Sequence, residues 1–140
     1  MERKYKLLVI DDENNILTTF QDYFTKRGFL VDTASDGVEG LEKLRVDEFD
    51  VAIVDFKMPK LNGIDMISQA LATDTDANMI IMSGLGESDK ADVIKALNTG
   101  VDAWFEKSDL ELPQLLKRVT ELAQVIPPDM VRRIASMIPE

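Results

Sequence analysis

Five side chains that could take part in chemistry each follow a short apolar run in this sequence of 140 residues. Such runs, rich in β-branched and aromatic residues, suit strands that are buried on both faces of a parallel sheet. The carboxyl ends of parallel strands lie at one edge of a sheet, where ligands bind. We therefore expect one crevice to contain Asp11, Asp12, Asp55, Ser83 and Lys107.

Three carboxylates in one crevice repel each other, and a hard divalent cation removes this conflict. Mg²⁺ prefers oxygen ligands and is typically held by one or two carboxylates together with phosphate oxygens. Asp55 is then the natural nucleophile, because a carboxylate can form an aspartyl-phosphate. Lys107 can neutralise the charge of the phosphoryl group, and Ser83 can donate a hydrogen bond to one of its oxygens.

The elements that must position these residues follow a regular alternation. Five apolar runs predict strands, and the stretches between them show helical periodicity. This pattern predicts an α/β fold with a five-stranded parallel sheet and helices on both faces. The predicted strands are 7–10, 29–31, 51–54, 79–82 and 103–105. The fourth predicted helix has apolar residues at Ala91, Ile94 and Leu97.

Local signals mark several helix boundaries. A basic pair before Gly28 is typical of a helix end. Ser108 with Glu111 matches a capping box at the start of the last predicted helix of the sheet domain. Gly40 lies inside the second predicted helix, where glycine costs about 1 kcal/mol relative to alanine.

Composition excludes several kinds of function. The absence of cysteine excludes disulfides and thiolate chemistry, and the absence of histidine excludes imidazole bases and the usual zinc ligands. The net charge of −10 argues against direct nucleic-acid binding, which Lys and Arg drive. No signal peptide or membrane span is recognisable, so we expect a cytoplasmic protein that does not bind membranes.

Over residues 5–125 the sequence resembles the receiver domain of two-component response regulators. The resemblance implies a flavodoxin-like sheet with strand order 2-1-3-4-5 and a signalling module rather than a conventional enzyme. The residues that carry it are Val9-Ile10-Asp11-Asp12-Glu13, Asp55-Phe56-Lys57-Met58-Pro59 with Gly63, Met82-Ser83-Gly84, and Lys107.

The resemblance also implies roles for individual residues. Asp55 would accept a phosphoryl group from a sensor histidine kinase or a histidine phosphotransfer protein, which explains why the chain needs no histidine of its own. Ser83 and Lys107 would hold the phosphoryl oxygens. The implied Mg²⁺ ligands are Asp11, acting through a bound water, Asp12, Asp55 and the backbone carbonyl of Lys57.

Switching in this family moves the serine and the loop after it, here residues 84–87, and an aromatic residue on the fifth strand. That aromatic is usually Tyr or Phe, and here it is Trp104. We expect phosphorylation to change the surface formed by the fourth helix, fifth strand and fifth helix. This surface would bind a downstream protein or output domain, or a second copy of the chain.

In the family proline follows the lysine in a cis bond, whereas here Ser108 predicts a trans bond.

Three alternatives remain open on the sequence alone. A Mg²⁺-dependent aspartyl-phosphate phosphatase would have Asp-x-Asp after the first strand, where this chain has Asp11-Asp12. A flavodoxin would have a hydroxyl-rich phosphate loop there. A pseudo-receiver would act as a protein-binding scaffold without being phosphorylated.

The sequence predicts two parts, a receiver domain at 1–125 and a short amphipathic helix or linker at 126–140. Pro127 and Pro128 must interrupt the preceding helix. Apolar residues then recur on one helical face, opposite Arg132 and Arg133. A segment this short is not stable as an isolated helix. We expect it to contact other protein surfaces or to lead to an output domain outside this sequence.

Overall fold

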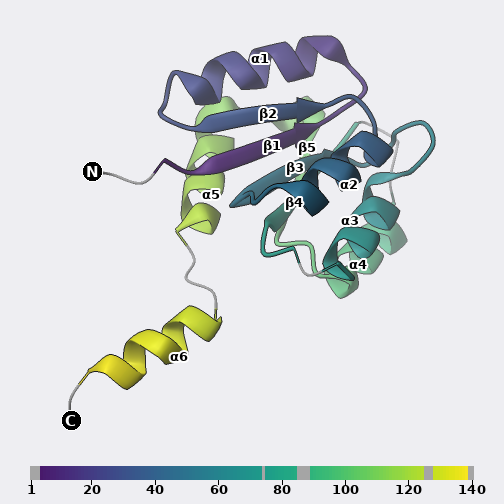
Figure 1. Cartoon of the computed structure of the whole chain (residues 1–140). Coiled ribbons are helices and arrows are strands. Elements are labelled where there is room, and N and C mark those ends of the chain that lie inside the picture. The colour runs from purple at the N-terminus through teal and green to yellow at the C-terminus, as the bar shows by residue number, and fades with distance from the viewer. Residues whose placement is uncertain (1–3, 74, 85–88, 125–127, 139–140) are drawn as a thin grey trace.

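Five parallel strands form the centre of the fold, and helices follow each strand in turn (Figure 1). The computed structural model describes residues 4–73, 75–84, 89–124 and 128–138. The elements are β1 (Lys6–Ile10), α1 (Asn14–Thr25), β2 (Leu30–Ala34), α2 (Gly37–Val46), β3 (Val51–Asp55), α3 (Gly63–Leu71), β4 (Asn78–Ser83), α4 (Lys90–Thr99), β5 (Ala103–Glu106), a 3₁₀ turn (Lys107–Asp109), α5 (Leu112–Ala123) and α6 (Pro128–Met137).

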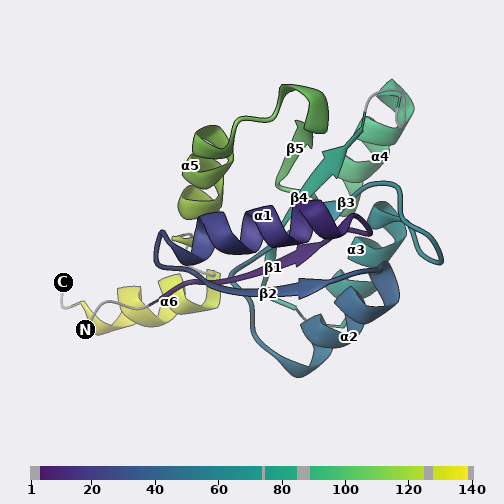
Figure 2. The same ribbon diagram turned by 90° about the horizontal axis from the view of Figure 1, so that it is seen from above.

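The strand order is β2-β1-β3-β4-β5, and every pairing is parallel. The flavodoxin-like α/β fold expected from the resemblance is therefore confirmed. Helices α1 and α5 cover one face of the sheet, whereas α2, α3 and α4 cover the other (Figure 2). All five strands end at the same edge because each crossover returns the chain in the same direction.

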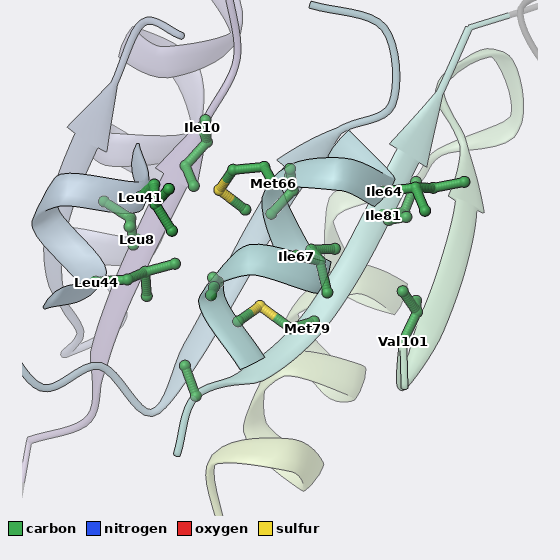
Figure 3. Packing of buried hydrophobic residues seen from close by; sticks show 14 of the residues in the cluster. Leu8, Ile10, Leu41, Leu44, Ile64, Met66, Ile67, Met79, Ile81 and Val101 are labelled. Carbon is green, nitrogen blue, oxygen red and sulfur yellow. The ribbon is translucent and has the colours of Figure 1, made fainter. Parts of the chain in front are cut away.

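Two apolar layers hold the helices against the sheet. One lies between the sheet and α1 and α5, and contains Phe20, Phe24 and Leu115. The other lies under α2, α3 and α4 (Figure 3). Its fully buried members include Leu8, Ile10, Met66, Ile67, Met79 and Ile81. Because β1, β3 and β4 contribute to both layers, these strands are apolar along almost their whole length.

The second strand differs from its prediction. The apolar run 29–31 places it too early, since the strand is Leu30–Ala34 and includes Asp32 and Thr33. At the edge of the sheet these polar residues are only half-buried, and Asp32 forms an ion pair with Lys43. Burial on both faces was therefore a wrong expectation for β2. Such an edge position tolerates side chains that a central strand would exclude.

Two predictions about helices also need correction. Ser108 does not cap α5, because it lies in the 3₁₀ turn and the helix begins only at Leu112. Glu111 occupies the N-cap without a side-chain hydrogen bond. Helix α4 forms as predicted, but Ile94 and Leu97 of its apolar repeat are 49% and 56% exposed. The spacing identified the helix, while Ala96 on another face contacts the core.

Other local predictions agree with the structure. Helix α1 ends at Thr25, and Gly28 follows with a φ of 93°, a left-handed conformation that favours glycine. Gly40 lies in α2 against β1, and a Cβ there would lie 2.5 Å from Cδ1 of Ile10. Close packing of helix on strand therefore explains a glycine inside a helix.

Helix α6 stands clear of the sheet and its covering helices in Figure 1. Its described apolar side chains, Ile134 and Met137, are 43% and 74% exposed. The predicted amphipathic pattern also includes Met130 and Val131, whose side chains lie outside the described residues. No helix within the described ranges is long and apolar enough to cross a bilayer.

Candidate functional site

The four predicted strand ends meet at one edge of the sheet. Asp11 directly follows β1, while Asp55 and Ser83 are the last residues of β3 and β4. Lys107 begins the 3₁₀ turn immediately after β5. Asp11 and Ser83 are fully buried, and Asp55 is 2% exposed. The predicted convergence of these side chains at one edge of the sheet is therefore observed.

Lys107 connects the two buried carboxylates. Its Nζ lies 3.1 Å from Oδ2 of Asp11 and 3.3 Å from Oδ1 of Asp55. The lysine reaches both although Ser108 follows it and no described peptide bond is cis. Glu13, a contact that the sequence analysis did not identify, has its Oε1 3.6 Å from the same ammonium. Its position directly after Asp11-Asp12 was the only available signal.

Asp12 is exposed but belongs to the same cluster. Carboxylate oxygens of Asp11, Asp12 and Asp55 all lie within 4.8 Å of one another. Neither Oδ2 of Asp11 nor Oδ1 of Asp55 receives a well-directed hydrogen bond, although both lie in ionic contact with Lys107. Buried carboxylate oxygens are normally satisfied, and a divalent cation with oxygen preference would satisfy these two. The residues present therefore fit a Mg²⁺ ion.

Electrostatics at this edge reflect burial and crowding of charge. Burial, and then the negative charge of Asp11, raise the pKa of Asp55 to about 7. Burial also raises the pKa of Asp11, against the hydrogen bond that Oδ1 accepts from the backbone of Glu13 at 2.9 Å. The pKa of Lys107 is raised, because although burial opposes its charge, the carboxylates of Asp11 and Asp55 favour it.

The loop after Asp55 folds back over the end of β3. The backbone N–H of Phe56 donates to the carbonyl of Met82 at 2.7 Å, and that of Gly63 donates to the carbonyl of Phe56 at 2.9 Å. Lys57 is exposed at the start of this loop, whereas Met58 is buried under it. The side chain of Lys57, two residues after Asp55, therefore faces solvent.

Ser83 and Trp104 are the two predicted switch residues. The hydroxyl of Ser83 donates to the carbonyl of Gly84 at 3.3 Å. The ring of Trp104 on β5 lies against Phe56, with ring centroids 5.5 Å apart. Of the predicted mobile loop, residues 85–87 lie outside the described residues.

A family model for the response regulator receiver domain matches residues 7–120, which include every strand end of the site. The chain belongs to this family. The match confirms the family that the sequence motifs indicated.

Individual relatives support the same assignment. The receiver is 35% identical over 129 residues to a probable transcriptional regulator ycf27 of Guillardia theta, covering 88% of this chain and 50% of that protein. It is 33% identical over 121 residues to the chemotaxis protein CheY of Treponema pallidum, covering 84% and 82%. The chain spans about half the length of the ycf27 regulators that it matches.

A solved receiver domain described as CheY-like, from Methanospirillum hungatei, superposes with a TM-score of 0.81. It is 25% identical, and the match covers 86% of this chain and 94% of that one. The fold of this receiver is therefore that of solved CheY-like domains.

Proposed function

We propose that this receiver accepts a phosphoryl group on Asp55 from a phosphohistidine of a partner kinase or phosphotransfer protein. The observation that carries the proposal is the pair of buried carboxylates, Asp11 and Asp55, joined by the ammonium of Lys107 at 3.1 and 3.3 Å. A carboxylate oxygen of Asp55 would attack phosphorus while the bond from phosphorus to the histidine nitrogen breaks. Asp55 must be ionised to attack, and its neighbours determine this ionisation.

The remaining residues have distinct proposed roles. Asp12, Asp55 and the backbone carbonyl of Lys57 would hold Mg²⁺, with Asp11 acting through a water. Mg²⁺ would supply charge neutralisation of the phosphoryl oxygens. Lys107 would exchange a carboxylate contact for a phosphoryl oxygen, and the hydroxyl of Ser83 would donate to another oxygen. All these residues are present, so nothing favours a scaffold without phosphorylation.

The output surface is proposed to be α4, β5 and α5. Ile94 and Leu97 give α4 an exposed apolar face, which suits a protein partner. Several relatives are named transcriptional regulators and are about twice as long as the aligned region. We propose that the switched surface acts on a downstream protein or output domain, or on a second copy, in the cytoplasm. The division into a receiver at 1–125 and an interacting segment at 126–140 belongs to the same proposal.

The direct test is incubation with Mg²⁺ and acetyl phosphate, a small phosphodonor, followed by intact mass measurement. We expect one added phosphoryl group on the wild type and none on Asp55→Asn. Asp22→Asn, which removes an exposed carboxylate on α1, is the matched control and should be phosphorylated normally. An adduct that survives in Asp55→Asn, or no adduct on the wild type with any small donor, would contradict the proposal.

Replacing Lys57 with alanine should shorten the lifetime of the aspartyl-phosphate by about threefold, the size of one exposed charge interaction, without abolishing its formation. The exposed ammonium would partly neutralise the phosphoryl charge and would limit the approach of water. Lifetimes follow from intact mass after the donor is removed. Lys60→Ala is the control, because Lys60 lies on the same loop but forms its ion pair with Asp36. Equal lifetimes for Lys57→Ala and the wild type would refute this role.

A further inference from the structure

Trp104 is held by two contacts on the same face of β5. Its ring lies against Phe56 at an interplanar angle of 49°, and its indole N–H donates to Oε1 of Glu106 at 3.2 Å. Trp104 and Glu106 are two residues apart, so their side chains point to the same side of the sheet. Both side chains are only partly buried. The hydrogen bond therefore fixes an aromatic ring that could otherwise move.

Together with the chain itself, these contacts form a closed path of neighbouring residues that begins and ends at Asp55. Phe56 directly follows Asp55 in the chain, and Glu106 directly precedes Lys107. Lys107 returns to Asp55, with Nζ 3.3 Å from Oδ1. Starting from Asp55, the path therefore runs through an aromatic contact and a hydrogen bond before an ion pair closes it.

Strand pairing places this path of contacts beside Ser83. Glu106 is the register partner of Ser83, and Trp104 is the partner of Ile81. Ile81 and Trp104 belong to the apolar layer under α2, α3 and α4. The hydrogen bond draws the carboxylate of Glu106 back along β5 towards Trp104, since Trp104 comes earlier in the strand. A movement of Lys107 would thus be transmitted to Trp104 through its immediate neighbour Glu106.

We propose that Glu106 is a positioning residue that holds Trp104 against Phe56 in the unphosphorylated receiver and releases it when Lys107 engages a phosphoryl group. This role rests on the proposed function of Asp55. A hydrogen bond of 3.2 Å tolerates little displacement before it weakens. A change of contact at Lys107 would therefore loosen the indole. Loss of this bond would favour the switched state by about fivefold, the equilibrium effect of one hydrogen bond.

The first experiment examines the unphosphorylated protein. Trp104 is the only tryptophan, so intrinsic fluorescence reports on it alone. In Glu106→Ala the emission should shift to longer wavelength and iodide quenching should increase. Glu106→Gln keeps a side-chain oxygen acceptor and should behave like the wild type. Circular dichroism melts verify that both variants are folded. Equal quenching of Glu106→Ala and the wild type would overturn the holding role.

The second experiment examines coupling to the site. Beryllofluoride with Mg²⁺ serves as the phosphoryl mimic, and its binding is followed by ¹⁹F NMR. Glu106→Ala should reach half-saturation at up to about fivefold lower concentration, because the resting state has lost a stabilising bond. Glu106→Gln should remain near the wild type. Unchanged half-saturation in Glu106→Ala would overturn the coupling.

The experiments distinguish a wrong assignment of Asp55 as the acceptor from a wrong role for Glu106. If the wild type takes up neither a phosphoryl group nor beryllofluoride, Asp55 is not an acceptor, and coupling through Glu106 is overturned with it. The quenching experiment needs no phosphorylation and still decides whether Glu106 holds Trp104. An adduct on Asp55 together with identical behaviour of all Glu106 variants would refute the inference while leaving the proposed function intact.

Discussion

Replacing Asp55 with asparagine is expected to raise the free energy of unfolding of the metal-free protein by about 2–4 kcal/mol above roughly pH 8. Asp55 is 2% exposed, and burial together with Asp11 raises the pKa of its carboxyl group to about 7. Ionised Asp55 is therefore a source of instability that an uncharged amide of similar size removes. We therefore expect the residue most important for the proposed chemistry to destabilise the fold.

The pH dependence follows from the direction of the shift. The pKa of Asp55 is higher in the folded chain than in the unfolded chain, so folding favours the protonated form. The stabilisation from this group is complete below about pH 4 and is lost as the pH rises towards about 7. Urea unfolding in EDTA at a series of pH values should show a larger loss in the wild type than in Asp55→Asn, in which buried Asp11 still contributes.

Mg²⁺ should reduce the difference between the two proteins, because a cation at the carboxylates offsets their repulsion in the wild type. Asp22→Asn serves as a control for the removal of one exposed negative charge. If the curves of the wild type and Asp55→Asn run parallel from pH 4 to about 8, burial and Asp11 do not control the ionisation of Asp55.

Convergence of the site was predictable because it depends on topology rather than on side-chain detail. Once Asp11, Asp55, Ser83 and Lys107 are assigned to the ends of parallel strands, a common edge follows. The structure places Lys107 within 3.3 Å of both buried aspartates. The order of the strands came from the family resemblance, since alternation alone permits more than one parallel sheet.

The bounds of β2 and the start of α5 were not predictable from the sequence, because they depend on the position of each element in the fold. The polar residues Asp32 and Thr33 concealed the end of β2, since edge strands need no continuous apolar run. Ser108 and Glu111 have the spacing of a capping box. Ser108, however, is part of the 3₁₀ turn that begins at Lys107, so it cannot be the N-cap of α5. The bond between Trp104 and Glu106 was in principle accessible, because residues two apart share a face of a strand.

Replacing Gly63 with alanine is expected to lower the free energy of unfolding by about 3 kcal/mol, a large overpacking effect. A Cβ on Gly63 would lie 2.5 Å from the carbonyl oxygen of Asp55 and 3.1 Å from Cα of Phe56. Both are backbone atoms, which cannot rotate away as a side chain can. The N–H of Gly63 also donates to the carbonyl of Phe56, so the loop cannot open without losing this bond.

Relief of this clash must displace Asp55 or α3, so Gly63→Ala should also slow phosphorylation by acetyl phosphate. Gly40→Ala is the matched control, because its Cβ would meet side-chain atoms of Ile10 rather than the backbone, with Cδ1 at 2.5 Å, Cγ1 at 2.9 Å and Cγ2 at 3.1 Å. A gain in helix propensity of about 1 kcal/mol and a shift of the Ile10 side chain should offset part of the cost. Urea unfolding gives the free energy of unfolding of both variants. If Gly63→Ala is no less stable than Gly40→Ala and is phosphorylated at the rate of the wild type, close backbone packing at Gly63 does not position the acceptor.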